Sequence, residues 1–278
     1  MDISKYPLVT VQGKSKLLGE TEQFRLYECR LPDEGGAGIL KIAATTAENP
    51  LLDREAFLLR AMRDEAKRLE EEYALVKEDP SILLNYQITF PNLVESFIAE
   101  DQDDRRVNIL SFVGVADDIG RLVPIEQIVF RDRVRIDPKT SAWIMGKLLK
   151  LLVFLHDQGI VAGGVDGENI LIERDQHYIA LFDFTEANIY GVGGLPANLA
   201  AKDIAKAAKQ VILALGGDPA TGVLPADDQL KSRDYELFLH NLAEENEHDA
   251  ARAHEAFYRL VRALWPSRGF HPFTAYPL

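Results

Sequence analysis

The sequence predicts an α+β protein, with a small antiparallel β-sheet and one main helix in its first part and a mostly helical second part. Two observations lead to this prediction. Short β-type runs dominate roughly the first hundred residues, whereas helical periodicity of apolar residues dominates the remainder. One strongly amphipathic helix interrupts the β-rich part. We therefore expect two compact parts in succession along the chain.

The β-rich part begins with a predicted hairpin. Residues 26–29 and 38–43 have the composition of strands, and the glycines of the segment 32–36 between them can adopt the positive φ that tight turns require. Two more strands are predicted at 93–98 and 107–112, separated by a charged turn. These four strands form the predicted small sheet.

The helix of this part is predicted over 53–73. Ala56, Leu59 and Met62 recur near one helical face, while charged residues occupy the rest of the surface. Asp53 is the expected N-cap, because its short carboxylate can accept hydrogen bonds from the first free backbone N–H groups.

The second part is predicted to be mainly helical. A helix follows the start signal Asp137-Pro138 and ends at Gly159. Apolar runs at 170–172 and 179–182, with polar turns around them, predict a second hairpin. Two later apolar stripes predict helices, one ending at Gly216-Gly217 and one over 257–264.

Composition argues against several classes of function. The chain has 278 residues, a formal net charge of -13 and a pI near 5.0, which disfavours binding to nucleic acid or to an anionic membrane surface. A single cysteine, Cys29, excludes an internal disulfide and a cysteine-rich zinc site, and we expect it to be a free buried thiol. No apolar run approaches the roughly 20 residues that span a bilayer. We therefore expect a cytoplasmic protein.

Three segments of the second part resemble one known family. They read L-H-D-Q-G-I-V at 155–161, E-N-I-L-I at 168–172 and I-A-L-F-D-F at 179–184. In order and spacing they resemble the catalytic loop and metal-binding segment of protein kinases, in which L-H-x-x-G-I-V-H-R-D-x-x-x-x-N-I-L precedes a hairpin and D-F-G. The resemblance extends over roughly residues 16–268 and implies a two-lobed protein-kinase-like fold.

Weaker matches follow the same order along the chain. Lys41 ends a G-I-L-K run that resembles the V-A-I-K strand of the family, and Glu55 falls where the family's helix glutamate is expected. Residues 90–94 resemble the entry to the fourth strand, and Asp203-Ile204 resembles the start of the helix that anchors the second lobe. The resemblance places a hinge at 111–113, which implies an N-lobe over 1–113 and a helical C-lobe over 114–278.

The resemblance implies binding of ATP and Mg²⁺. The residues implied to bind the nucleotide are Leu18, Gly19, Lys41, Leu110 (as the gatekeeper), Val113 and Leu171. A strand lysine can contact a phosphate if a helix carboxylate such as Glu55 holds its long side chain. Asn169 and Asp183 can supply the oxygen ligands that Mg²⁺ prefers.

The sequence departs from the family at the catalytic positions. The family's H-R-D is replaced by Ala162-Gly163-Gly164, so Gly164 occupies the place of the general base. Loss of a general base costs roughly 10²–10⁴ in rate, so ordinary Ser/Thr kinase activity is expected to be low or absent. Asp166 stands where the family carries a phosphate-holding lysine. It is interpreted as a displaced base, as a further metal ligand or as a solvated turn residue.

Other motifs are also altered. The glycine-rich loop keeps Gly19 but loses the two later glycines and gains Glu20 and Glu22. D-F-G is replaced by D-F-T at 183–185, and the segment from there to Asp203 carries no A-P-E motif. The six histidines show no metal-ligand spacing. The aromatic and proline-rich tail at 268–278 is expected to pack on the second lobe, with partner binding as the alternative.

Three functions are compatible with this pattern. The first is a pseudokinase that binds Mg-ATP and acts through regulated association with a protein partner whose identity the sequence leaves open. The second is an atypical kinase-fold transferase that moves a phosphoryl or nucleotidyl group from ATP, with Lys41, Glu55 and Asp166 as its catalytic residues. The third is a scaffold without nucleotide, against which the retained Lys41, Glu55, Asn169 and Asp183 argue.

Overall fold

A computed structural model describes residues 1–32, 36–77, 84–115, 118–225, 233–266 and 269–278. The chain divides into two compact units, Met1–Arg121 and Leu122–Leu278. Each unit has its own hydrophobic core and its own sheet, and each is described by itself. None of the helices in the described ranges is long and apolar enough to cross a membrane.

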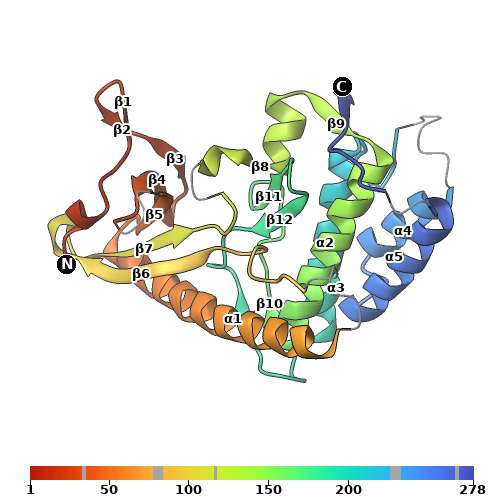
Figure 1. Ribbon diagram of the computed structural model, residues 1–278, viewed down its shortest axis with the longest axis horizontal. Coiled ribbons are helices and arrows are strands. Elements are labelled where there is room, and N and C mark those ends of the chain that lie inside the picture. The colour runs from red at the N-terminus through yellow and green to blue at the C-terminus, as the bar shows by residue number, and fades with distance from the viewer. Residues whose placement is uncertain (33–35, 78–83, 116–117, 226–232, 267–268) are drawn as a thin grey trace. The chain divides into compact units, whose positions relative to one another are not determined.

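The first unit is built on a five-stranded antiparallel sheet (Figure 1). Its strands lie in the order β3-β4-β5-β7-β6 and are β3 (Leu17–Glu20), β4 (Phe24–Arg30), β5 (Ala37–Ala43), β7 (Arg105–Ser111) and β6 (Asn92–Ala99). The central strand β5 is buried along its whole length, which is why its sequence is a continuous apolar run apart from Lys41. The predicted hairpin and the two later strands are confirmed, although residues 33–35 of the predicted turn lie outside the described residues.

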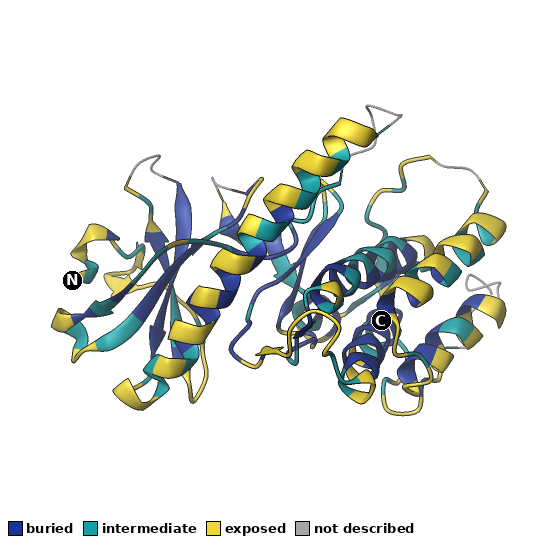
Figure 2. Ribbon diagram, turned by 90° about the horizontal axis from the view of Figure 1, so that it is seen from below, coloured by how far each residue is buried: buried dark blue, intermediate teal, exposed yellow. Residues whose placement is uncertain are grey.

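Helix α1 (Asn49–Val76) packs against β6 and β7 of this sheet. Its inner face is buried from Leu52 to Ala66, its outer face is exposed, and its last turns carry no buried residue (Figure 2). The predicted N-cap, Asp53, is wrong, because the helix begins earlier and Asp53 lies within it, 2.9 Å from Arg106. The start signal is instead the capping box of Thr45 and Glu48, which closes a 3₁₀ turn, η2 (Thr46–Glu48), immediately before the helix.

Smaller elements complete the first unit. They are η1 (Ile3–Lys5), the short hairpin of β1 (Thr10–Val11) and β2 (Lys14–Ser15), η3 (Glu100–Gln102) and η4 (Ile119–Arg121). Cys29 lies in the core with Tyr6, Leu40 and Phe97, as a free thiol, as predicted. Burial raises the pKa of Cys29 to about 12, so the thiol stays protonated and unreactive at neutral pH.

Four helices dominate the described part of the second unit. They are α2 (Pro138–Asp157), α3 (Ala197–Ala214), α4 (Arg233–Ala243) and α5 (Ala250–Leu264). Helix α2 packs against α3 and α5. Asp137 caps α2 by accepting a hydrogen bond from the Thr140 backbone N–H at 2.6 Å, so the predicted start at Asp137-Pro138 is confirmed. Helix α4 was not predicted, although Tyr235, Leu239 and Leu242 follow helical spacing.

Short strands position the loops of this unit. β11 (Ile170–Glu173) and β12 (Tyr178–Leu181) form the predicted hairpin, extended by β8 (Leu122–Pro124), which is followed by a π-helical turn, η5 (Gln127–Arg131). β10 (Ile160–Val161) pairs with β13 (Asn188–Ile189). β14 (Ala275–Pro277), in the C-terminal tail, pairs with β9 (Val134–Ile136), so the tail packs on its own unit as predicted.

Candidate functional site

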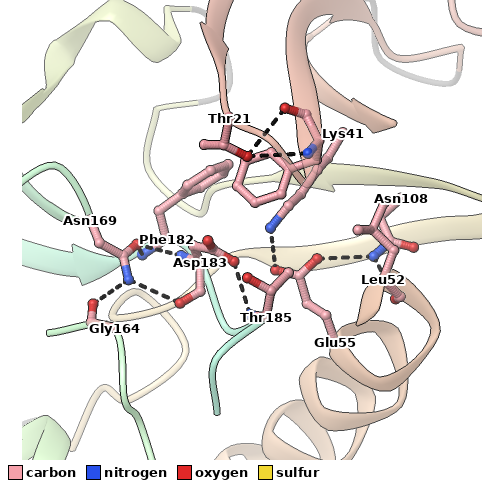
Figure 3. A network of polar contacts seen from close by, with 11 residues as sticks. Thr21, Lys41, Leu52, Glu55, Asn108, Gly164, Asn169, Phe182, Asp183 and Thr185 are labelled. Atoms are coloured by element: carbon pink, nitrogen blue, oxygen red, sulfur yellow. Dashed lines mark hydrogen bonds and ion pairs between the residues drawn. The ribbon is translucent and has the colours of Figure 1, made fainter. Parts of the chain in front are cut away.

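The buried ion pair of Lys41 and Glu55 is the centre of the candidate site in the first unit (Figure 3). Lys41 Nζ lies 2.7 Å from Glu55 Oε1, and neither side chain is exposed at all. Lys41 comes from the central strand β5 and Glu55 from the second turn of α1. The ion pair that the sequence predicted is therefore present.

Asn108 holds this pair in place and was missed in the sequence. It lies on β7 directly opposite Lys41, and its Nδ2 donates to Glu55 Oε2 at 3.0 Å and to the Leu52 carbonyl at 2.9 Å (Figure 3). Both carboxylate oxygens of Glu55 are thus engaged, as a buried ion pair requires if its desolvation is to be offset. The signal in the sequence was an amide side chain inside the apolar run Val107-Asn108-Ile109.

Phe24, at the start of β4, covers one side of the Lys41 ammonium. Nζ lies 4.0 Å from the ring centroid, within the range of a cation–π interaction. The ring is only 4% exposed and packs in a cluster with Ala43 and Leu52. Phe24 had no predicted role, because only the pairing of β4 with β5 places it beside Lys41.

The segment predicted to cover the nucleotide forms a closed turn between β3 and β4. Leu18 and Gly19, which were both predicted to bind nucleotide, belong to β3. Leu18 is exposed, and Gly19 pairs with Leu26 of β4. The Glu20 carboxylate accepts a hydrogen bond from Arg25 Nε at 2.6 Å. Arg25 therefore offsets the negative charge of Glu20, one of the two glutamates in the predicted glycine-rich loop.

The remaining predicted nucleotide-binding residues lie at different depths. Leu110, the predicted gatekeeper, is fully buried in β7, and Val113, two residues beyond that strand, is 41% exposed. Leu171 belongs to β11 in the second unit and is buried. Their roles toward a nucleotide stay predictions.

Asn169 in the second unit is fixed by four hydrogen bonds (Figure 3). Its Oδ1 accepts from the backbone N–H groups of Phe182 and Asp183, and its Nδ2 donates to the carbonyls of Gly164 and Asp183. The two N–H groups and two carbonyls fix the orientation of the amide. Its oxygen therefore accepts backbone hydrogen bonds here. Asn169 can coordinate Mg²⁺ through this oxygen only after these hydrogen bonds break.

Asp183 is better placed than Asn169 for the predicted role of a metal ligand. It follows β12 and is partly exposed, and its Oδ1 accepts from the Thr185 N–H at 2.9 Å. Within the described ranges, no group of three or more histidine, cysteine, aspartate or glutamate side chains could hold a metal ion. A single carboxylate fits the way proteins bind Mg²⁺ through nucleotide phosphates and water.

The loop at 162–167 is anchored by Asp203. The Asp203 carboxylate accepts from the backbone N–H groups of Ala162 at 2.8 Å and Gly163 at 3.0 Å, and His156 Nε2 lies 3.3 Å from it. Asp203 lies in the second turn of α3 rather than at the helix start predicted for it, because α3 begins at Ala197. Asp203 therefore lies in the predicted helix, but its contact with the loop was not predicted.

Gly164 and Asp166 occupy the altered catalytic positions. A Cβ atom on Gly164 would lie 3.1 Å from Asn169 Nδ2, so little room exists there for a side chain. Asp166 is exposed, and its Oδ1 accepts from the Asn169 N–H at 3.1 Å, which is the geometry of a turn aspartate. Although the residue is exposed, desolvation by the surrounding loop raises the pKa of Asp166; Glu168 and Glu186 act in the same direction, while the Asn169 N–H and Lys206 oppose the shift.

The structure therefore places five of the predicted site residues in two groups, one in each unit. Lys41 and Glu55 meet in the first group, and Asn169 and Asp183 meet in the second, where Asp166 is hydrogen-bonded to Asn169. The Lys41 group offers a cation, and the Asp183 group offers a carboxylate next to a tightly hydrogen-bonded loop.

Comparison with known proteins identifies the fold. No family model matches the sequence, and no curated protein matches it. Of 1969 matching chains among solved structures, one is the crystal structure of Rad53 1-466 in complex with AMP-PNP, with a TM-score of 0.59 and 14% sequence identity. The alignment covers 90% of this chain and 60% of the Rad53 chain, so the present chain spans somewhat less than two thirds of that protein. The chain has a protein-kinase-like α+β fold, which confirms the predicted fold class.

Proposed function

We propose that this chain is a pseudokinase: a kinase-fold protein that binds Mg-ATP and acts through nucleotide-dependent association with a protein partner. The observation that carries the proposal is the buried Lys41–Glu55 pair. Burying two charges costs several kcal/mol per ion before their attraction is counted, so such a pair is poor evidence of a purely stabilising role. A lysine held in this way is suited to contact a phosphate.

The Asp183 group of the second unit supports the same function. Asp183 offers a carboxylate for Mg²⁺, whose other ligands would be phosphate oxygens and water. Gly164 offers no general base, and its crowding against Asn169 disfavours a side chain there. The matching Rad53 structure holds AMP-PNP, an analogue of ATP, and the shared fold supports ATP as the class of ligand for this chain.

One observation favours the alternative of an atypical transferase. The pKa of Asp166 is raised, which improves a carboxylate as a proton acceptor near neutral pH. The hydrogen bond from the Asn169 N–H to the same side chain favours its role as a turn residue. We therefore place the transferase second.

Calorimetric titration of the full chain with ATP, with and without Mg²⁺, tests the proposal. Mg-ATP at a hundred times its Kd should also raise the free energy of unfolding by about 2.7 kcal/mol. Lys41→Met should weaken Mg-ATP binding, and Asp183→Asn should abolish its dependence on Mg²⁺. Lys67→Met is the matched control, since Lys67 is 67% exposed on α1 and should bind as the parent does.

A folding control and one contrary outcome complete this experiment. Lys41→Met leaves Glu55 buried without its cation, which costs about 3–5 kcal/mol of stability, so circular dichroism must show that the variant is folded at the titration temperature. Absence of binding by the parent at millimolar Mg-ATP would favour the scaffold function instead.

A further inference from the structure

Phe24 lies against Lys41 because of strand register. β4 and β5 pair so that Phe24 is directly opposite Ala43, and side chains two residues apart on a strand share a face, so Lys41 is on the same face. Ala43 is small and leaves space for the ring, which also contacts Leu52 from α1. The ring therefore lies over the Lys41 ammonium, at 4.0 Å from Nζ to the centroid.

The turn that leads into Phe24 is closed by its own hydrogen bonds. The Thr21 N–H donates to the Phe24 carbonyl at 2.9 Å, and Thr21 Oγ1 accepts from the N–H groups of Gln23 at 3.2 Å and Phe24 at 3.1 Å. The Gln23 carbonyl accepts from the Ala44 N–H at 2.8 Å. In this conformation these N–H groups donate hydrogen bonds within the turn or to it from the neighbouring strand, and the bonds hold the Phe24 backbone in place.

We propose that Phe24 sets the nucleotide affinity of this chain by competing with phosphate for the Lys41 ammonium. This inference rests on the proposed function, in which Lys41 contacts a phosphate. An ammonium offers three donors in a tetrahedral arrangement, of which one is directed to Glu55. The ring occupies a second direction of approach, so an incoming phosphate oxygen must displace it or avoid that side.

The competition predicts selectivity among nucleotide ligands. A cation–π contact is worth about 0.5–2 kcal/mol, which corresponds to a factor of about two to thirty in an equilibrium constant. This penalty applies to ligands whose phosphates reach Lys41 and does not apply to adenosine, which has no phosphate. The ratio of ATP affinity to adenosine affinity therefore reports the contribution of Phe24.

The test is isothermal titration of the full chain and of Phe24→Leu with Mg-ATP and with adenosine. Leucine keeps apolar contacts with Ala43 and Leu52 but has no aromatic face. We expect Phe24→Leu to bind Mg-ATP about two- to thirtyfold more tightly than the parent and to bind adenosine equally well. Phe24→Ala, which also removes bulk, should strengthen Mg-ATP binding at least as much. Phe57→Leu is the matched control, since Phe57 is 63% exposed on α1, and should leave both affinities unchanged.

The outcomes separate this inference from the proposed function. If the parent binds Mg-ATP and Phe24→Leu binds it no more tightly, or if Mg-ATP and adenosine weaken together, the role of Phe24 is wrong and the proposed function stands. Binding by the Phe24 variants alone would support the inference and show that the parent site is closed by its own side chain. Absence of Mg-ATP binding in the parent and in both Phe24 variants would overturn both proposals.

Discussion

The absence of a side chain at Gly164 matches the limited space around this residue. The sequence showed that the general-base position is a glycine, and the structure adds that a Cβ there would lie 3.1 Å from Asn169 Nδ2. That amide cannot easily yield, because Nδ2 donates to the carbonyls of Gly164 and Asp183. Restoring an aspartate at 164 therefore disturbs the residue next to the candidate metal ligand.

We predict that Gly164→Ala and Gly164→Asp both lower the free energy of unfolding by about 1–3 kcal/mol, as overpacking does, and that neither confers label transfer from ATP. Urea denaturation and a radiolabel assay measure the two effects. Gly269→Ala is the control, since a Cβ there meets nothing within 4 Å, and its stability should equal that of the parent. Phosphoryl transfer by Gly164→Asp at full stability would contradict the prediction.

Asp166 illustrates the limit of assigning roles by sequence position. The sequence left open whether it is a displaced base, a metal ligand or a turn residue. Its hydrogen bond from the Asn169 N–H favours the turn, while its raised pKa keeps the first role open to test. Loss of a measurable transfer activity in Asp166→Ala would support the transferase alternative.

At the scale of elements, the C-terminal tail is held by aromatic stacking as well as by β14. His177, in the turn of the β11–β12 hairpin, is stacked between Trp143 of α2, at 4.8 Å between ring centroids, and Phe270 of the tail, at 4.2 Å. His271 Nε2 lies 2.7 Å from the Asp137 carboxylate that caps α2. The tail thereby ties the start of α2 to the hairpin.

The lowered pKa of His177 in this stack predicts that stability depends on pH. Burial lowers the pKa of His177, the electrostatic effects of His271 and Lys147 lower it further, and Glu173 acts in the opposite direction. The unfolded chain, in which a histidine pKa is about 6.5, therefore binds a proton more readily than the folded chain. The stability from neutral His177 is fully present above that pH and is lost as the pH falls through the lowered folded pKa.

We predict that His177→Asn loses less stability than the parent between pH 7.5 and pH 5.5. Asparagine tolerates the positive φ of 56° at this position, so the backbone is preserved while the titrating ring is removed. Thermal unfolding at the two pH values measures the difference. His248→Asn, at an exposed position, should keep the pH dependence of the parent. An equal loss of stability in His177→Asn and the parent would show that His177 does not contribute.

At the scale of the whole molecule, the proposed function gives a role toward Mg-ATP to one residue of each unit. Lys41 belongs to the first unit and Asp183 to the second. If Lys41 contacts a phosphate and Asp183 holds the Mg²⁺ bound to that nucleotide, the two substitutions affect the same complex. Independent sites give additive effects, within about 0.3–0.5 kcal/mol.

A double-mutant cycle tests this coupling. We predict that Asp183→Asn weakens Mg-ATP binding less in the Lys41→Met background than in the parent, because part of the interaction is already lost. Calorimetric Kd values for the parent, both single variants and the double variant measure the coupling. The same cycle with Lys67→Met in place of Lys41→Met should be additive. Additivity in both cycles would mean that Lys41 and Asp183 do not serve one nucleotide.

Local sequence patterns determined most of the helices and strands and the two residues of the buried ion pair. Periodicity predicted α2, the β4–β5 and β11–β12 hairpins and the C-terminal helix, and the family spacing paired Lys41 with Glu55. The absence of a general base at Gly164 could also be read directly from the sequence. These features depend on residues close together in the chain or on an ordered motif.

Only the tertiary structure decided what surrounds those residues. Asn108 meets Glu55 across 53 residues, and Asp203 meets the loop at Ala162 across 41 residues. Phe24 reaches Lys41 through the register of β4 against β5, in which a slip by one residue would turn its ring to the opposite face. Local patterns do not encode such contacts, because they arise when separate strands and helices pack and their side chains come to share one buried space.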